Sequence, residues 1–279
     1  MLIVTAALIV ALALFAFPAL RWIDIHLTQE RLKDTWGEWR YGEDWGAVSA
    51  LREDLNYAWL HAAGEPILIA HALGEAGLPG QNSVTALRRS LAAGLRLLEI
   101  DLWLDDSGVL RCHHGPEPPA SFVAGDCTLA EALHVAAEAD AWLVLDIKTD
   151  FPAAGAAIVS QFVGDAAASR LVFQLYRPSD LPLFVNWSMQ LPLPGPIVTA
   201  YRARRSLRHI AAHAPHLNLR AMTFPLYRTA ALGSKPDGLV WLVHPIHDCA
   251  SAAAAQSVSI DGMYVHSALV AVMRAGCKR

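Results

Sequence analysis

The feature that most constrains the fold is a repeated alternation of short apolar runs with alanine-rich helical runs. Eight runs have the length and composition of strands, and a weaker ninth candidate covers residues 221–224. Segments with helical character, such as 83–93 and 151–162, separate most of them. Repeated strand–helix units favour a parallel sheet with helices outside it. The eight predicted strands are 66–70, 97–104, 109–114, 142–148, 171–175, 196–199, 239–244 and 262–265.

Eight such units predict an α/β fold in which residues 66–279 form a closed TIM (β/α)8 barrel. An open, doubly wound sheet is the alternative. That fold normally carries a phosphate-binding glycine motif between its first strand and a helix. Gly74, Gly77 and Gly80 follow the first predicted strand, but no helix begins among them. This absence favours the barrel.

The first 20 residues carry no charged side chain. A helix of that length spans about 30 Å, the thickness of the hydrocarbon core of a bilayer. A cleaved signal peptide would begin with a basic segment, and no Lys or Arg precedes this run. We therefore expect residues 1–20 to form a transmembrane anchor, or an uncleaved signal, and the protein to be a single-pass membrane protein.

The side of the membrane stays open. Arg21, Arg31 and Lys33 follow the apolar run, which favours a cytoplasmic location for the rest of the chain. Exported single-span enzymes usually carry the opposite bias. Residues 21–65 contain clustered tryptophans, and they are expected to form either a juxtamembrane helical collar or an amphipathic packing helix.

Charge and cysteine content exclude several classes of protein. The net charge is −4 and the single basic cluster, 202–208, is short, so a nucleic-acid partner is not expected. The four cysteines lack the paired spacing of a zinc site. Their even number permits one or two disulfides without requiring them. Hydrophobic residues make up 54% of the chain, which excludes a disordered protein.

Two acidic residues interrupt an otherwise apolar strand. In LLEIDLWL, side chains alternate, so Glu99 and Asp101 share one face with Trp103. Two carboxylates this close repel each other and lose hydration when buried. They are tolerated if they are exposed, paired with cations or bound to a metal. A salt-bridged pair at a strand edge is the alternative, but the apolar strand favours a metal site.

A second strand, WLVLDIK, ends with Asp146 and Lys148 on one face. Asp146 would complete a set of three oxygen ligands suited to a hard divalent cation such as Ca²⁺ or Mg²⁺. Lys148 would bind a phosphate oxygen. The alternative is a local Asp–Lys contact on an exposed edge.

Histidines also occur at predicted strand ends. His71 ends the first strand, and His113 and His114 end the third. Histidine can give or take a proton near neutral pH. A cation, a lysine and two histidines together suit phosphodiester hydrolysis, because they can neutralise charge on the phosphate, activate the nucleophile and protonate the leaving oxygen.

These segments resemble the motifs of the glycerophosphodiester phosphodiesterases, which belong to the phospholipase C-like phosphodiesterase superfamily of TIM barrels. The resemblance covers residues 67–268. In chain order, the family has a strand ending in His-Arg-Gly, a Glu-Asn-Thr loop, a Glu-x-Asp-Val strand, and an Asp-Gly turn before a strand ending in His-Asp. It then has an acid-x-Lys strand, a strand with Gln, a Trp-Thr-Val-Asn strand and Asp-Gly-Ile at the last strand. The corresponding segments here are AHALG, QNSVTAL, LEIDLW, DDSGVLRCHHG, LDIK, LVFQLY, VWLVHP and IDGMYV.

The resemblance implies a phosphoric diester hydrolase with a role for each candidate residue. His71 and His114 would be the acid/base pair, and Lys148 a phosphate contact. His114 is preferred to His113 because it lies six positions after Gly108, as in the family. The implied metal ligands are Glu99, Asp101 and Asp146.

The chain also departs from the family pattern. Ala72 replaces an arginine that should contact phosphate, Gln81 replaces a loop glutamate, and Gly115 replaces an aspartate. The His-Gly pair, and Asp before x-Lys, are similar to the sphingomyelinase D-like phospholipases of the same superfamily.

Three hypotheses for function follow from this comparison. The first is metal-dependent hydrolysis of a glycerophosphodiester or lysophospholipid. The second is a sphingomyelinase D-like or phospholipase D-like reaction that forms a cyclic phosphate. The third is an inactive, membrane-tethered binding barrel. Retention of both histidines and all three acids favours an enzyme. The expected partners are a small-molecule or lipid-derived phosphodiester and a membrane.

Overall fold

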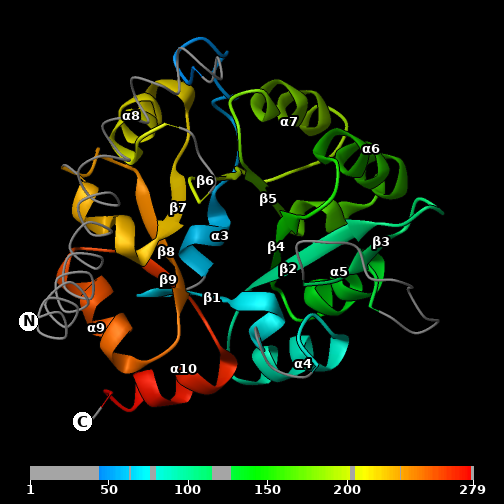
Figure 1. Cartoon of the computed structure of the whole chain (residues 1–279). Helices are drawn as coiled ribbons and strands as arrows, with labels where there is room; N and C mark the ends of the chain where they lie inside the picture. Colours follow the sequence, from blue (N-terminus) through cyan, green and yellow to red (C-terminus); the bar gives the residue numbers. More distant parts are fainter. Residues whose placement is uncertain are drawn as a thin grey trace, which may run out of the picture.

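The protein contains a closed barrel of eight parallel strands (Figure 1). The computed structural model describes residues 44–62, 64–75, 80–114, 127–201, 205–232 and 234–277. Closure occurs at the first strand, where Ile69 is in register with Leu97 on one side and Tyr264 on the other. The barrel strands are β1 (Ile67–Ala70), β2 (Leu97–Leu104), β4 (Trp142–Ile147), β5 (Leu171–Leu175), β6 (Ile197–Thr199), β7 (Ala221–Pro225), β8 (Val240–Ile246) and β9 (Gly262–Val265).

Helices surround the barrel, and most begin at a polar cap. Ser83 accepts a hydrogen bond from the N–H of Ala86, and Asp150 accepts one from Ala153. Such caps satisfy N–H groups that have no partner within the helix. The helices are α4 (Val84–Ala92), α5 (Leu129–Glu138), α6 (Phe151–Phe162), α7 (Asp180–Ser188), α8 (Leu207–His213), α9 (Cys249–Ser257) and α10 (Ser267–Arg274). Short 3-10 segments are η2 (His71–Gly74), η3 (Ala166–Arg170), η4 (Pro215–Leu217) and η5 (Leu226–Ala231).

The predicted barrel is confirmed, but the prediction that residues 109–114 form one of its parallel strands is wrong. β3 (Leu110–Cys112) pairs antiparallel with β2 and extends it as a hairpin outside the barrel. Asp105 starts the connecting turn by accepting hydrogen bonds from the N–H groups of Ser107 and Val109. The weaker candidate, 221–224, is instead the barrel strand β7. A tight Asp–Gly turn favours a hairpin over a crossover, which needs a dozen or more residues.

A short helix, α3 (Ala58–Ala62), packs at the amino-terminal end of the barrel (Figure 1). Trp59 is completely buried there against the first residues of several strands, and its indole N–H donates to the carbonyl of Gly195 at 2.9 Å. Because this end is filled, the opposite, carboxyl end of the strands is the one available for a site.

The structure contradicts the predicted single-pass membrane location. Among the described residues no helix is both long and apolar enough to cross a bilayer. The longest described helix, α6, has 12 residues, which corresponds to about 18 Å against the roughly 30 Å required. The predicted anchor, residues 1–20, lies outside the described residues. Residues 21–43 of the predicted collar also lie outside them.

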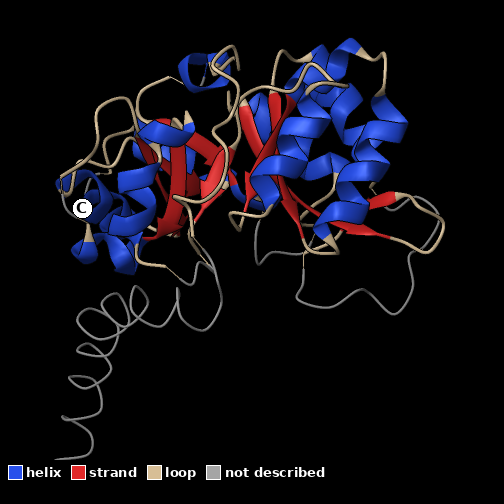
Figure 2. Ribbon diagram, turned by 90° about the horizontal axis from the view of Figure 1, so that it is seen from above, coloured by secondary structure: helices blue, strands red, loops and turns tan. Residues whose placement is uncertain are grey.

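Two disulfides are present. Cys112 pairs with Cys127, with their Cα atoms 5.2 Å apart, and Cys249 pairs with Cys277 at 5.6 Å. The first joins the end of β3 to the start of α5, close to His114. The second joins the start of α9 to the residues after α10. Figure 2, turned by 90° from Figure 1, shows the barrel from the side, with helices on the outer sides of the strands.

Candidate active site

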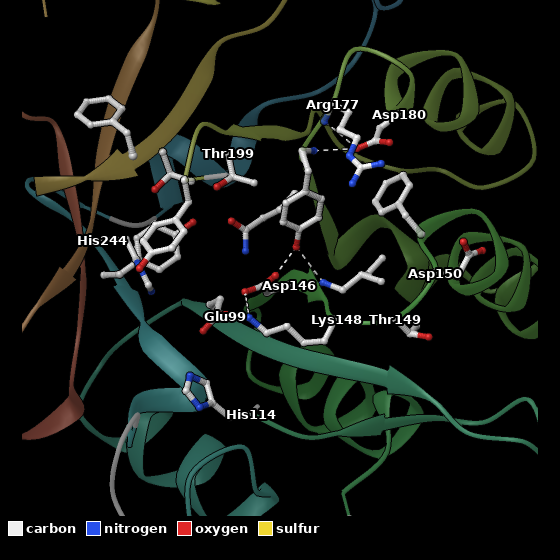
Figure 3. Close-up of a pocket in the computed structure, with 18 of the residues that line it drawn as sticks. Glu99, His114, Asp146, Lys148, Thr149, Asp150, Arg177, Asp180, Thr199 and His244 are labelled. Atoms are coloured by element: carbon white, nitrogen blue, oxygen red, sulfur yellow. Dashed lines mark hydrogen bonds and ion pairs between the residues drawn. The ribbon is translucent and has the colours of Figure 1, made fainter. Parts of the chain in front are cut away.

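A pocket of about 850 Å³ opens at the carboxyl end of the strands. Figure 3 shows it with the side chains that line it. Five of the six predicted site residues lie in its wall: His71, Glu99, His114, Asp146 and Lys148. The sixth, Asp101, is fully buried beneath the wall and contacts Lys148.

Neighbouring strands bring the three predicted carboxylates together. β2 and β4 are parallel and place Asp101 directly beside Asp146, while Glu99 precedes Asp101 by two residues on the same face. One oxygen from each carboxylate lies within 4.8 Å of the others. Glu99 and Asp101 are almost wholly buried, with exposed fractions of 1% and 0%. The period-two alternation of β2 therefore places both acids on one face, as predicted, and in the structure this face lies inside the barrel.

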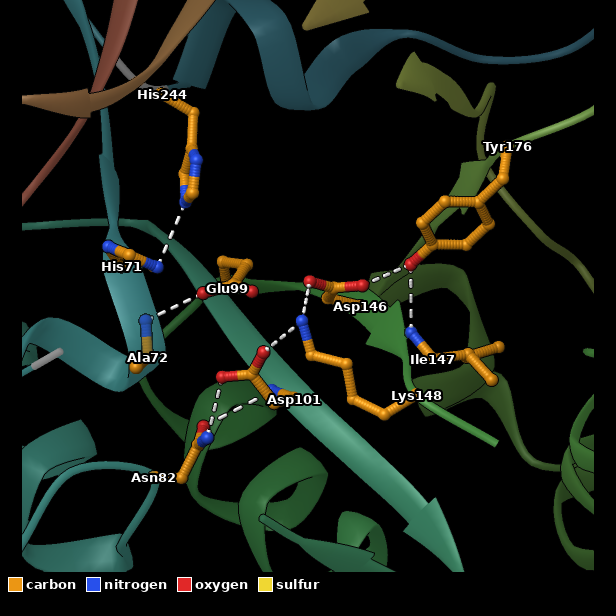
Figure 4. Close-up of polar contacts among 10 residues, drawn as sticks. All are labelled: His71, Ala72, Asn82, Glu99, Asp101, Asp146, Ile147, Lys148, Tyr176 and His244. Atoms are coloured by element: carbon orange, nitrogen blue, oxygen red, sulfur yellow. Dashed lines mark hydrogen bonds and ion pairs between the residues drawn. The ribbon is translucent and has the colours of Figure 1, made fainter. Parts of the chain in front are cut away.

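Lys148 supplies one positive charge to this cluster. Its ammonium lies 2.7 Å from Asp101 Oδ1 and also forms an ion pair with Asp146 (Figure 4). Burial disfavours the charged ammonium, but the surrounding carboxylates, Asp146 first, raise the pKa of Lys148 above its usual range. Lys148 therefore carries a full charge at neutral pH.

One lysine does not balance three acids. Burial raises the pKa of Glu99 well above its ordinary value, and the charges of Asp101 and Asp146 raise it further. Burial also raises the pKa of Asp101, against the opposing effect of Lys148. With all three acids ionised, the cluster therefore has more negative than positive charge, because Lys148 supplies a single positive charge. Three converging oxygen donors with a charge deficit fit a hard divalent cation such as Mg²⁺ or Ca²⁺.

Hydrogen bonds orient each carboxylate. The backbone N–H of Ala72 donates to Glu99 at 2.6 Å, and the amide of Asn82 donates to Asp101 at 2.7 Å. The Tyr176 hydroxyl donates to Asp146 and accepts a 3.0 Å hydrogen bond from the N–H of Ile147 (Figure 4). Such contacts fix the direction of a carboxylate and tune a metal site.

A second group of candidate ligands lies away from the pocket. Asp44, His209 and His213 also have ligand atoms within 4.8 Å of one another. However, Arg205 Nη2 lies 2.9 Å from Nδ1 of His209, which places a guanidinium against one of these imidazoles. Since that group is permanently charged, it opposes a bound cation, and we assign no metal to this group.

The two predicted acid/base histidines both line the pocket and lie close together. His71 begins η2 directly after β1, and His114 follows β3 by two residues. Their ring centroids are 5.9 Å apart. His113 lies outside the pocket wall and packs against Trp103, with the rings 6.3 Å apart. The structure thus places His114, rather than His113, beside His71.

Comparison with known proteins supports the sequence resemblance at the level of fold. No family model matches the chain, and no curated protein matches it. Solved structures do match. A glycerophosphodiester phosphodiesterase from Parabacteroides distasonis has a TM-score of 0.58 and 17% identity, over 75% of this chain and 97% of that one.

Two further similar structures come from other bacteria. A phosphodiesterase from Oleispira antarctica, in complex with the product sn-glycerol-3-phosphate, has a TM-score of 0.57 and 16% identity, over 76% of this chain and 96% of that one. A glycerophosphodiester phosphodiesterase from Thermotoga maritima has a TM-score of 0.53 and 16% identity, over 75% of this chain and 97% of that one. The chain has the fold of glycerophosphodiester phosphodiesterases. The predicted fold resemblance is confirmed.

The sequence patterns assign no role to four residues that lie at or near this cluster, although Tyr176 is a residue near a predicted strand end that could line a pocket. Asn82 and Tyr176 hold the two aspartates, and His244, on β8, lies 2.9 Å from His71 between Nε2 atoms. His266, directly after β9, lies further out, with its ring centroid 6.3 Å from that of His71. A usable signal existed for Tyr176, His244 and His266, because each lies near the carboxyl end of a predicted strand. The contacts themselves depend on barrel closure.

Proposed function

We propose that the protein is a phosphoric diester hydrolase that cleaves a glycerophosphodiester or a lysophospholipid with the aid of a divalent cation. The observation that carries this proposal is the convergence of Glu99, Asp101 and Asp146 within 4.8 Å beside His71 and Lys148. The shared fold with glycerophosphodiester phosphodiesterases, which are phosphoric diester hydrolases, supports the same reaction class.

The acidic cluster would hold the cation through one oxygen each of Glu99, Asp101 and Asp146. When bound, the cation would supply electrostatic stabilisation of the negative charge on the phosphate. Lys148 already lies in the wall of the pocket, and its ammonium would bind a phosphate oxygen next to the acids.

The two histidines would move the protons. Burial, reinforced by the neighbouring histidines, lowers the pKa of His71, so this imidazole is neutral at pH 7. In hydrolysis, one imidazole takes a proton from water as the water oxygen bonds to phosphorus. The bond between phosphorus and the leaving oxygen breaks, and the other imidazole protonates that oxygen.

The pocket accommodates more than a phosphate. Beyond the polar cluster, apolar and aromatic side chains complete the wall, among them Phe151, Leu183, Tyr201 and Phe224. The neighbour from Oleispira antarctica holds sn-glycerol-3-phosphate, the product expected from a glycerophosphodiester. A glycerol phosphate unit at the acids, with its substituent along the apolar wall, fits this arrangement.

The decisive experiment follows the phosphorus-containing products by ³¹P NMR. Glycerophosphocholine and lysophosphatidylcholine are each incubated with the protein after EDTA treatment, with and without added Mg²⁺ or Ca²⁺. We expect a phosphate monoester to form only when the cation is added. A cyclic phosphate would instead show that a substrate hydroxyl attacks phosphorus, and no product from either substrate would contradict the proposal.

A pair of adjacent variants controls for folding. His114→Ala should abolish turnover, whereas His113→Ala, which alters the next residue outside the pocket wall, should retain it. Both proteins should show wild-type circular dichroism. Equal activity of the two variants would remove His114 from the proposed acid/base pair.

A further inference from the structure

The interior of the barrel changes from apolar to polar at one level on two neighbouring strands. Ile197 and Ala221 face the interior near its filled end, where they belong to the buried cluster around Trp59. Two residues further along the same strands, Thr199 on β6 and Thr223 on β7 line the pocket. Residues two apart in a strand share one face, so the hydroxyls lie directly above the apolar layer.

Thr199 and Thr223 are the centre of a larger uncharged group. The register of β6 and β7 pairs them directly, and only 4% and 3% of their surfaces are exposed. Gln174 on β5 and Tyr264 on β9 line the same pocket and are also buried. We refer to these four residues, Gln174, Thr199, Thr223 and Tyr264, as the neutral floor.

Two hydroxyls of the neutral floor have no hydrogen-bond partner. Thr223 Oγ1 and the Tyr264 hydroxyl are buried, and neither forms a hydrogen bond with a described residue. Burial, followed by the charge of Glu99, raises the pKa of Tyr264 well above its usual value, against a smaller opposing effect of the nearby Thr223 hydroxyl. The Tyr264 hydroxyl therefore stays protonated. A buried hydroxyl without a partner is costly, and a ligand that supplies the partner is correspondingly favoured.

The neutral floor adjoins the place proposed for the phosphate. The charges of Glu99 and Asp146 both act on Tyr264, which places its hydroxyl near the acids. Figure 3 shows Thr199 on the side of Glu99 and Asp146 that is opposite to His114. An alcohol that is esterified to a phosphate at the acids and Lys148 would therefore extend over the neutral floor.

The chemistry of the neutral floor matches hydroxyl groups. A threonine or tyrosine hydroxyl and a glutamine amide can each donate and accept hydrogen bonds, and so can a hydroxyl of a ligand. A quaternary ammonium has no N–H to donate and would leave these groups unpaired. We propose that Gln174, Thr199, Thr223 and Tyr264 form a subsite for hydroxyl groups of the alcohol that is esterified to the phosphate.

This proposal rests on the proposed function and narrows its substrate class. Two parts of a phosphodiester could supply the hydroxyls, the glycerol unit or a polyol headgroup. Matched phosphate monoesters distinguish them: sn-glycerol 3-phosphate against propyl phosphate, and myo-inositol 1-phosphate against cyclohexyl phosphate. Within each pair the carbon skeleton is the same and only the hydroxyls differ.

Isothermal titration of each ester into the Mg²⁺-saturated protein measures binding without turnover. We expect the hydroxylated member of at least one pair to bind roughly 10- to 100-fold more tightly, because an ester without hydroxyls leaves buried polar groups unpaired. The pair that shows the preference identifies the part of the substrate that is recognised.

Variants without hydroxyls test the assignment to these residues. Thr199→Val/Thr223→Val keeps the side-chain shape, and the preference should fall to within about threefold while the ester without hydroxyls binds as in the wild type. Tyr264→Phe should lower the preference independently. Thr229→Val is the matched control, because the Thr229 hydroxyl donates to the carbonyl of Leu226 at 2.8 Å and lies outside the pocket wall. It should retain the full preference.

The contrary outcomes are specific. Equal affinities within both pairs for the wild type would overturn the proposal, as would a preference that survives unchanged in the double variant and in Tyr264→Phe. An equal loss of affinity for both members of a pair would show that the variants disturb the phosphate position, which also contradicts the proposal. If the wild type cleaves no phosphodiester but shows the preference, the proposed function fails while the subsite stands. If none of the four esters binds, both fail.

Discussion

The hydroxyl of Tyr176 bridges the side chain of Asp146 and the backbone N–H of Ile147. Tyr176 follows β5, and Asp146 and Ile147 end β4, so the bridge joins two neighbouring strands. Burial, with the nearby charge of Asp146, raises the pKa of Tyr176 well above its usual value. The hydroxyl therefore remains protonated and always donates to this carboxylate.

We predict that Tyr176→Phe weakens cation binding. Without the hydroxyl, Asp146 loses the hydrogen bond that fixes its direction, and contacts of this kind are worth roughly 10- to 100-fold in metal affinity. Isothermal titration of the EDTA-treated protein with Mg²⁺ or Ca²⁺ measures the effect directly. Tyr227→Phe is the control, because Tyr227 is 55% exposed and does not line the pocket. Equal affinities of all three proteins would show that Tyr176 does not orient a ligand.

Glu99→Gln should remove the stabilising effect of the cation, and it should stabilise the metal-free protein. In the metal-free protein, Glu99 is buried beside two other acids, and a neutral amide relieves their repulsion. The pKa of Glu99 is raised on folding, so its effect on stability becomes less favourable as pH rises above 4.5, the ordinary value.

Thermal unfolding distinguishes the variant from the wild type. At pH 8 in EDTA, Glu99→Gln should have the higher Tm, whereas added cation should raise Tm only in the wild type. Glu138→Gln, an exposed change on α5, should behave as the wild type in both buffers. A cation-dependent Tm that survives in Glu99→Gln would place the ion elsewhere.

The buried histidines should make the protein sensitive to acid. The pKa of His244 falls from 6.5 in the unfolded chain to about 4 in the fold, mainly through burial. Between these values the unfolded state binds the additional proton, so this contribution to stability is present above pH 6.5 and is lost as pH falls towards 4.

Urea unfolding at several pH values isolates the contribution of His244. Relative to wild type, His244→Gln should show a shallower loss of stability between pH 6.5 and 4, by up to about 1.4 kcal/mol per pH unit. The comparison between two proteins cancels the titration of groups that they share. Parallel curves would show that His244 does not change its pKa on folding.

Local patterns in the sequence were sufficient for much of the fold. The alternation in LLEIDLWL was sufficient to place Glu99 and Asp101 on one face of β2, because successive side chains in a strand point to opposite faces. Caps such as Ser83 likewise depend on nearby backbone groups. Both are short-range effects that a single segment contains.

Long-range relations could not be predicted in the same way. β3 has the composition of a barrel strand, yet the Asp105 turn folds it back on β2. α7 carries a proline and mixed side chains and shows no clear helical pattern in the sequence. His244 reaches His71 only because the barrel closes, and no local pattern encodes that closure.

The Cys112–Cys127 disulfide should matter for turnover as well as for stability. Cys112 precedes His114 by two residues, and the bond ties the end of β3 to the start of α5. Its 15-residue separation corresponds to about 3 kcal/mol in the chain-entropy account of disulfide stabilisation. Removing it frees the backbone that carries His114, so Cys112→Ser/Cys127→Ser should lower kcat several-fold in addition to lowering Tm.

The second disulfide provides the matched control for this prediction. Cys249 and Cys277 join α9 to the residues after α10, and neither lines the pocket. Cys249→Ser/Cys277→Ser should therefore lower Tm while kcat, measured well below both transitions, stays at the wild-type value. The wild-type protein treated with a reducing agent should lose kcat as the first double variant does. If both double variants retain full kcat, the link between β3 and α5 stabilises the fold without positioning His114.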